Sequence, residues 1–254
     1  MKAQQSHVDV LVVATHPDDA EATIGGTIAK LTQSGCSVAV VDASRGEMGT
    51  RGTVDDRKKE AARAARSLRL AWRANLELPD ARIVASPPAR EALARVIRNA
   101  KPWLLIGPWW VSDLHPDHAA VGLMTRQAFF LSGLQKLDPE SAPHRPKHLL
   151  YYASHDRFEP HFVSALTEAH FNAKIRALEC YATQVRSTSR RDKGQHFVFG
   201  RGFFERVLAR TRHDGILIGA PYGEGFRSEA ILSEENPIHM LLTGAHRVRS
   251  AERS

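Results

Sequence analysis

The apolar residues of this chain follow two different patterns. Short apolar runs, several of them rich in β-branched residues, predict buried strands at residues 8–14, 37–42, 74–78, 103–108 and 148–153. Between them, apolar residues recur every three or four positions and predict helices at residues 20–34, 54–68, 87–99 and 116–131. Strands that alternate with helices build right-handed crossover units. We therefore expect an α/β fold, with a Rossmann-like, mostly parallel β-sheet flanked by helices on both faces.

The C-terminal third is less regular. Its pattern predicts helices at residues 168–181 and 203–212 and a short strand at residues 216–219. We expect the basic segment 186–195 to be a loop and the residues from about 245 onward to be a loosely ordered tail. A length of 254 residues suits one α/β domain or two small ones, and we expect a single domain over residues 1–254.

The first predicted strand ends abruptly in His16-Pro17-Asp18-Asp19. Open α/β sheets bind ligands just beyond the carboxyl ends of their strands, so these polar residues lie where a site is expected. His16 and Asp19 are three residues apart, a spacing at which an imidazole nitrogen and a carboxylate oxygen can reach one divalent ion. A His-Pro-Asp sequence is also typical of a turn with a helix cap. The first motif alone therefore leaves both interpretations open.

A second cluster of the same kind, Asp113-Leu114-His115-Pro116-Asp117-His118, follows the strand predicted at 103–108. Two histidines and a carboxylate leave a fourth position open for water or substrate, which is the arrangement of catalytic zinc. Both clusters follow strands, and in each a proline comes directly after a histidine. A metal site shared by the two clusters is therefore favoured over two unrelated helix caps.

Three other polar residues lie near predicted strand or helix ends. Glu47 lies in a glycine-rich loop beyond the strand at 37–42, and Asp80 follows the strand at 74–78. Arg57 falls in the first turns of a helix, where a cation is unfavourable for the helix dipole. This mismatch leaves two interpretations open, a functional role or a solvated surface position.

Composition limits the classes of function. The formal net charge is +7, but the arginines are dispersed along the predicted helices and no aromatic-rich nucleic-acid signature accompanies them. No apolar run is long enough to span a bilayer, and no apolar segment precedes the first strand as in a signal peptide. We expect a cytoplasmic protein that binds neither nucleic acid nor membrane. Its positive charge is either a solvated basic surface or a means of attracting an anionic small substrate.

Six segments of the chain resemble those of a known family, and the resemblance extends from about Val8 to Phe226. The six segments are HPDDAEATIGGTIAKL, GTVDDRKKEAARAA, LPDA, HPDHAAVG, AKIRALECYATQ and YGEGF. In these segments the chain resembles the LmbE/PIG-L family of zinc-dependent N-acetylglucosamine deacetylases, most of all its bacillithiol-biosynthesis branch, which deacetylates N-acetylglucosaminyl malate. The resemblance implies one Zn²⁺ per chain, a small amino-sugar conjugate as substrate, and a homo-oligomer, either a trimer or a hexamer.

The resemblance also implies roles for individual residues. The zinc ligands it implies are His16, Asp19 and His118. Asp18 matches the general base, and His115 matches the residue that stabilises the oxyanion or protonates the leaving amine, with Asp117 orienting His115. These roles suit amide hydrolysis, because zinc acidifies water and polarises the carbonyl.

The substrate contacts that the resemblance implies are Glu47, Arg57 and Asp80, on the sugar or acyl side. Two departures from the branch concern the substrate. Leu114 stands where the branch tends to have arginine, and Thr183-Gln184-Val185 replaces its Ser-Gln-Phe. If that arginine holds the malate carboxylates, this protein uses another cation or a different aglycone.

Other functions remain open from the sequence. A noncatalytic nucleotide or nucleic-acid binder would explain the basic charge, but Gly25 and Gly26 lie inside a helix pattern, outside any G-x-G-x-x-G turn. A two-metal phosphoesterase would explain the histidines and aspartates, but it needs more ligands than these motifs supply. The other histidines beyond the second motif share no ligand spacing with either cluster and are expected in the surface or core: His144, His148, His155, His161 and His170.

Overall fold

The computed structural model describes residues 6–111, 113–185 and 202–230. Its strands are β1 (Val10–Ala14), β2 (Val38–Ser44), β3 (Trp72–Leu78), β4 (Leu104–Pro108), β5 (His148–Tyr152), β6 (Phe162–Leu166) and β7 (Tyr222–Arg227). Its helices are α1 (Asp19–Gln33), α2 (Val54–Ser67), α3 (Pro87–Ala100), α4 (Pro116–Leu131), α5 (Glu168–Glu179), α6 (Ala182–Val185) and α7 (Phe203–Ile216). Within the described ranges, no helix has the length and apolar content needed to cross a membrane.

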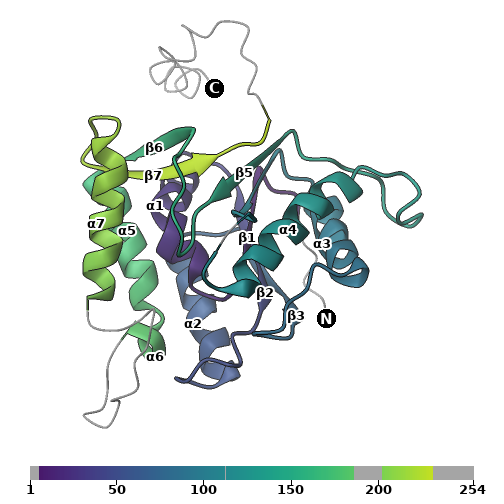
Figure 1. The fold of residues 1–254 in the computed structure, drawn as a ribbon, viewed down its shortest axis with the longest axis horizontal. Helices are drawn as coiled ribbons and strands as arrows, with labels where there is room; N and C mark the ends of the chain where they lie inside the picture. Colours follow the sequence, from purple (N-terminus) through teal and green to yellow (C-terminus); the bar gives the residue numbers. More distant parts are fainter. Residues whose placement is uncertain (1–5, 112, 186–201, 231–254) are drawn as a thin grey trace, which may run out of the picture.

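The strands form one seven-stranded sheet in the order β3-β2-β1-β4-β5-β7-β6 (Figure 1). Strands β1 to β5 are parallel to one another, whereas β7 runs antiparallel to both β5 and β6. From β1 the chain moves to one side through β2 and β3, then returns to place β4 on the other side of β1. The loops after β1 and β4 therefore diverge at a topological switch point, where such sheets bind ligands.

Helices cover both faces of the sheet, as the sequence predicts. On one face, Leu11 and Val13 of β1 pack with α3 and α4 in one apolar cluster. On the other, Val10 and Val12 pack with α1 and α5 in a second cluster. Because parallel strands are buried on both sides, they are apolar at successive positions without alternation. The predicted α/β fold class, a mostly parallel sheet between helical layers, is confirmed.

The C-terminal part corrects two expectations. Residues 216–219 are not a strand, because α7 continues to Ile216 and a turn follows. Ile216, Leu217 and Ile218 are 76, 54 and 44% exposed, so this apolar run has no sheet around it. Strands β6 and β7 were not predicted, and the helix expected over residues 168–181 ends earlier, at Glu179. The segment 186–195 and the tail from about 245 lie outside the described residues.

Helix α1 contains a kink that a distant strand stabilises. Ile24 has non-helical dihedral angles (φ −125°, ψ 19°), so the helix starts afresh beyond it. The Glu224 carboxylate of β7 accepts hydrogen bonds from the backbone N–H of Gly26 (3.0 Å) and of Thr27 (2.7 Å). The Lys174 Nζ of α5 donates to the same carboxylate at 2.7 Å. Glu224 therefore acts as an internal N-cap, and its charge is balanced by a buried lysine.

The paired glycines of α1 serve close packing. A Cβ atom at Gly26 would lie 2.5 Å from Leu166 Cδ1, and one at Gly25 would lie 3.1 Å from Lys174 Cγ. Close packing against β6 and α5 therefore explains both glycines.

Candidate metal centre

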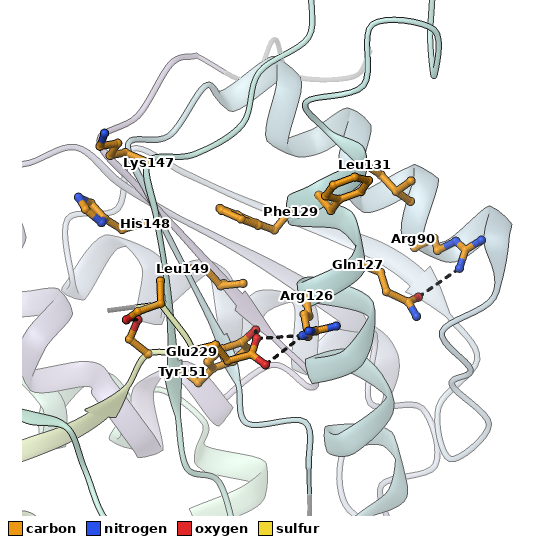
Figure 2. Close-up of a pocket in the computed structure, with 13 residues that line it drawn as sticks. Arg90, Arg126, Gln127, Phe129, Leu131, Lys147, His148, Leu149, Tyr151 and Glu229 are labelled. Atoms are coloured by element: carbon orange, nitrogen blue, oxygen red, sulfur yellow. Dashed lines mark hydrogen bonds and ion pairs between the residues drawn. The ribbon is translucent and has the colours of Figure 1, made fainter. Parts of the chain in front are cut away.

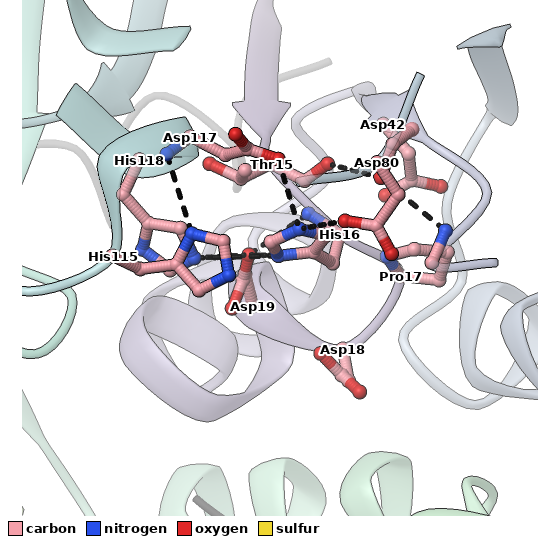
Figure 3. Close-up of polar contacts among 12 residues, drawn as sticks. Thr15, His16, Pro17, Asp18, Asp19, Asp42, Asp80, His115, Asp117 and His118 are labelled. Atoms are coloured by element: carbon pink, nitrogen blue, oxygen red, sulfur yellow. Dashed lines mark hydrogen bonds and ion pairs between the residues drawn. The ribbon is translucent and has the colours of Figure 1, made fainter. Parts of the chain in front are cut away.

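Three donor atoms from the two motifs converge beyond the ends of β1 and β4 (Figure 3). His16 follows β1, Asp19 begins α1, and His118 lies in the first turn of α4. The Asp19 Oδ2 atom is 3.3 Å from His16 Nδ1 and 3.2 Å from His118 Nε2. The two imidazole nitrogens are 3.3 Å apart. The residues predicted as metal ligands thus form a nearly equilateral triangle.

This triangle has the dimensions of a zinc site. Zinc binds histidine nitrogen and carboxylate oxygen at about 2.0–2.2 Å, and in tetrahedral geometry two such ligands lie about 3.3–3.5 Å apart. Burial acts to raise the pKa of Asp19, but His118 and His16 outweigh it and hold this pKa well below the usual value. The Asp19 side chain is therefore an anion that can bind a metal ion. The residues present therefore fit a zinc ion with one position left open.

His16 is fixed from its other side by Asp80. The His16 Nε2 atom lies 2.9 Å from Asp80 Oδ1, which leaves Nδ1 for the metal. Asp80 also accepts hydrogen bonds from the backbone N–H of Met48 and of Ala81. Burial acts to lower the pKa of His16, but contacts with its three neighbouring carboxylates raise it well above the usual value. Asp80, expected as a substrate contact, contacts His16 from the side away from Asp19, which is the position that carboxylates commonly take behind zinc-binding histidines.

His118 has a partner that the sequence did not reveal. Its buried Nδ1 atom makes no hydrogen bond among the described residues, and Asp113 Oδ1 is 3.7 Å away. Asp113 Oδ1 also accepts from the His115 N–H and lies 3.0 Å from His155 Nδ1. His155, expected in the surface or core, thus stands beside the metal centre. It lies three residues beyond the end of β5, so the reasoning that selected strand ends could have found it.

Asp18 is buried and paired with Arg57. The Arg57 Nη2 atom donates to Asp18 Oδ2 at 2.9 Å and to the Pro17 carbonyl at 2.5 Å. Burial, offset in part by Arg57 and reinforced by Asp19, raises the pKa of Asp18 to about 7. Asp18 also has a φ of 116°, a strained conformation for a non-glycine residue. Arg57, expected as a substrate contact, is only 5% exposed, and its guanidinium is paired with Asp18.

His115 is oriented by the backbone of Asp117. The Asp117 N–H donates to His115 Nδ1 at 3.2 Å, so the neutral ring carries its proton on Nε2. The Asp117 carboxylate was expected to orient His115, but it accepts from the N–H groups of Ala81 (2.7 Å) and Ile83 (3.2 Å). It also lies 3.8 Å from His16 Nε2. Burial and the two neighbouring imidazoles lower the pKa of His115.

Glu47 and Leu114 border the centre. Glu47 Oε1 accepts from the Asp80 N–H at 3.0 Å, whereas its buried Oε2 has no hydrogen-bond partner among the described residues. Of the three expected substrate contacts, Glu47 alone retains an unused acceptor atom. Leu114, directly before His115, is 60% exposed. An apolar side chain therefore stands at the position where the resembling branch has arginine.

Comparison with known proteins shows that this chain is similar to deacetylases. The PIG-L family model, described as GlcNAc-PI de-N-acetylase, matches residues 11–129, which include both motifs. Diacetylchitobiose deacetylase from Thermococcus kodakarensis is 28% identical over 189 residues, which cover 69% of this chain and 69% of that protein. Among solved structures, a conserved protein from Thermus thermophilus matches with a TM-score of 0.80 at 34% identity, covering 90% of this chain and 98% of that chain. N,N'-diacetylchitobiose deacetylase from Pyrococcus horikoshii matches with a TM-score of 0.75 at 25% identity, covering 88% and 83%.

Proposed function

We propose, from the premise that this chain belongs to the PIG-L family of deacetylases, that it hydrolyses the N-acetyl amide of a small N-acetylglucosamine conjugate using one zinc ion. The observation that carries the proposal is the triangle of His16 Nδ1, Asp19 Oδ2 and His118 Nε2, with sides of 3.2–3.3 Å. A two-metal phosphoesterase would need a second set of ligands around a neighbouring ion. Asp113, His118 and His155 lie close enough to offer one, but that set shares His118 with the triangle, so counting the bound ions separates the two functions.

Each residue around the triangle has a separate role in amide hydrolysis. Zinc, when bound, supplies Lewis acidity that polarises an amide carbonyl and lowers the pKa of water. Asp18 directly precedes a ligand, and its carboxylate accepts the proton of the attacking water. His115 donates a hydrogen bond from Nε2–H to the oxygen that gains negative charge, and the proton that Asp18 took from the water passes to the departing amine. Arg57 holds Asp18 in place, and Asp80 holds His16.

Within this class, we propose N-acetylglucosaminyl malate, the bacillithiol precursor, as the substrate, with Glu47 as a contact to the sugar or acyl group. The motifs quoted from the sequence support this choice. The exposed Leu114 supports the alternative, another N-acetylglucosamine-containing substrate with a less acidic aglycone. We further propose a cytoplasmic homo-oligomer, a trimer or hexamer.

The test is mass spectrometry of acetate release from N-acetylglucosaminyl malate, N-acetylglucosamine and chitooligosaccharides, with and without a chelator. Asp18→Asn should retain one zinc per chain and lose about 10²- to 10⁴-fold in turnover. Asp55→Asn, an exposed aspartate on α2, is the matched control and should retain full activity. Loss of acetate from the malate conjugate alone supports the finer proposal. Zinc-loaded protein that releases no acetate from any of the three, or that binds two ions, contradicts the function.

A further inference from the structure

A second concave surface lies away from the metal centre, between β5 and the C-terminal half of α4 (Figure 2). Its volume is about 520 Å³, within the range of cavities that bind ligands or peptide segments. The apolar residues that line it include Phe129, Leu131 and Leu149, which are only partly buried. We call this surface the β5–α4 groove. Its apolar lining lacks a cover among the described residues.

The polar border of the groove is basic. Arg90, Arg126 and Lys147 line it, and the one acidic residue of the lining is Glu229. Arg126 Nε contacts both Glu229 oxygens, at 3.0 and 2.9 Å, so this charge is already balanced. Within the described residues, neither Arg90 nor Lys147 forms an ion pair. The groove therefore fits an occupant that is apolar and also carries negative charge.

The chain itself runs into this groove. Ser228, Glu229 and Ala230, which follow β7, all belong to the lining. The Tyr151 hydroxyl donates to Glu229 Oε2 at 2.8 Å and fixes this stretch against β5. The ladder between β5 and β7 pairs only Tyr151 and Tyr152, so the same edge of β5 has no paired strand over residues 148–150 in the described part of the chain. Residue 231 thus follows directly from a point inside the groove.

The sequence that follows has the matching chemistry. Residues 231–242, ILSEENPIHMLL, contain six large apolar side chains and the acidic pair Glu234 and Glu235. In water these apolar residues would favour burial against any apolar surface within reach. We infer that residues 231–242 of the same chain occupy the β5–α4 groove, with their carboxylates facing Lys147 and Arg90. Packing there would stabilise α4, the helix whose first turn carries His118.

Zero-length coupling tests the placement in the full-length protein. A carbodiimide joins a lysine to a carboxylate only when they are in contact, so Lys147 should couple to Glu234 or Glu235. Lys136, an exposed lysine outside the groove lining, is the matched control and should not couple to them. Coupling in a mixture of isotopically light and heavy chains shows whether the carboxylate that reacts with Lys147 belongs to the same chain or to a second copy. Products within one chain support the inference, whereas mixed products assign the groove to a second copy and overturn it.

Hydrogen exchange provides a second readout that does not depend on the deacetylase reaction. In the wild type, amides of residues 231–242 should be protected. Phe130→Glu and Lys147→Glu change exposed residues of the lining, so the fold should persist while this protection falls about tenfold or more. Leu134→Glu and Lys136→Glu make the same changes outside the lining and should leave the protection unaltered. Unprotected amides in the wild type, or equal protection in all four variants, would overturn the inference.

Discussion

Replacing Glu224 with glutamine tests the account of the α1 kink. Glu224 is 3% exposed, and its carboxylate accepts from two backbone N–H groups of α1 and from Lys174 Nζ. Glutamine has nearly the same volume, so no cavity forms. It removes the charge and places an amide donor where acceptor atoms are needed. The substitution therefore isolates the polar contribution of this residue from its packing.

The expected loss is large for a single substitution. Removing one partner of a buried ion pair costs about 3–5 kcal/mol, because the other charge stays buried without compensation. Such a loss is a substantial part of the roughly 5–15 kcal/mol that typically separates folded from unfolded domains. Lys174→Met on the Glu224→Gln background removes the stranded ammonium, so the double variant should be more stable than Glu224→Gln alone.

The loss should also depend on pH. Burial lowers the pKa of Lys174, and Glu224 partly opposes this effect. Without Glu224, the pKa of Lys174 should fall further below its unfolded value. Between those two pKa values the unfolded state binds more protons, so the free energy of unfolding rises with pH. The difference between wild type and Glu224→Gln should therefore be smaller at about pH 9.5 than at about pH 7.

Urea unfolding followed by circular dichroism at both pH values measures these differences. Glu91→Gln, which removes an exposed carboxylate 3.6 Å from Arg95, is the control and should change stability by less than about 1 kcal/mol. The reasoning is refuted if Glu224→Gln costs no more than this control, or if its cost is the same at both pH values. Strict additivity with Lys174→Met would refute the pairing itself.

Three further predictions follow from the site and its supports. Asp80→Asn should weaken zinc binding about 10- to 100-fold, because His16 loses the carboxylate that orients it, and competition with a chromophoric chelator measures the change. Thr53→Ala removes the capping box that Thr53 forms with Asp56 and should cost about 1 kcal/mol in urea unfolding, whereas a loss near zero would contradict the cap. Removing zinc with a chelator should lower the free energy of unfolding by about 2.7–4.1 kcal/mol. The reference is protein in free zinc at about 100–1,000 times the dissociation constant of the site. A thermal midpoint that chelation leaves unchanged would contradict a zinc site in the folded state.

The sequence was most informative where strands are buried on both faces. Strands β1, β2, β4 and β5 were predicted because burial on two sides leaves continuous apolar runs. Strand β6 lies at the edge of the sheet and is mostly half-exposed, so its pattern is weaker. Residues 216–219 have the composition of a strand, but nothing in a local pattern distinguishes exposed aliphatic residues from buried ones.

At the candidate metal centre, the structure brings together the three residues that were predicted as ligands. The partners of those ligands were harder to predict, because hydrogen bonds between distant loops leave no spacing in the sequence. Arg57 and Asp80 were predicted as substrate contacts, and the structure shows the contacts that they make within the protein, with Asp18 and His16. Their roles depend on which loops meet at the switch point, and that depends on the whole sheet.

The contacts behind the ligands have a consequence for metal exchange. Glu47, Asp80 and Asp117 join three loops to one another and to His16 through hydrogen bonds within the protein. The side chain of His16 is therefore already held in place when the chain has folded, and a metal ion binds to donor atoms that are already oriented. Divalent ions of similar radius should therefore replace one another without rearranging the loops, and calorimetry of their binding should show little conformational entropy change.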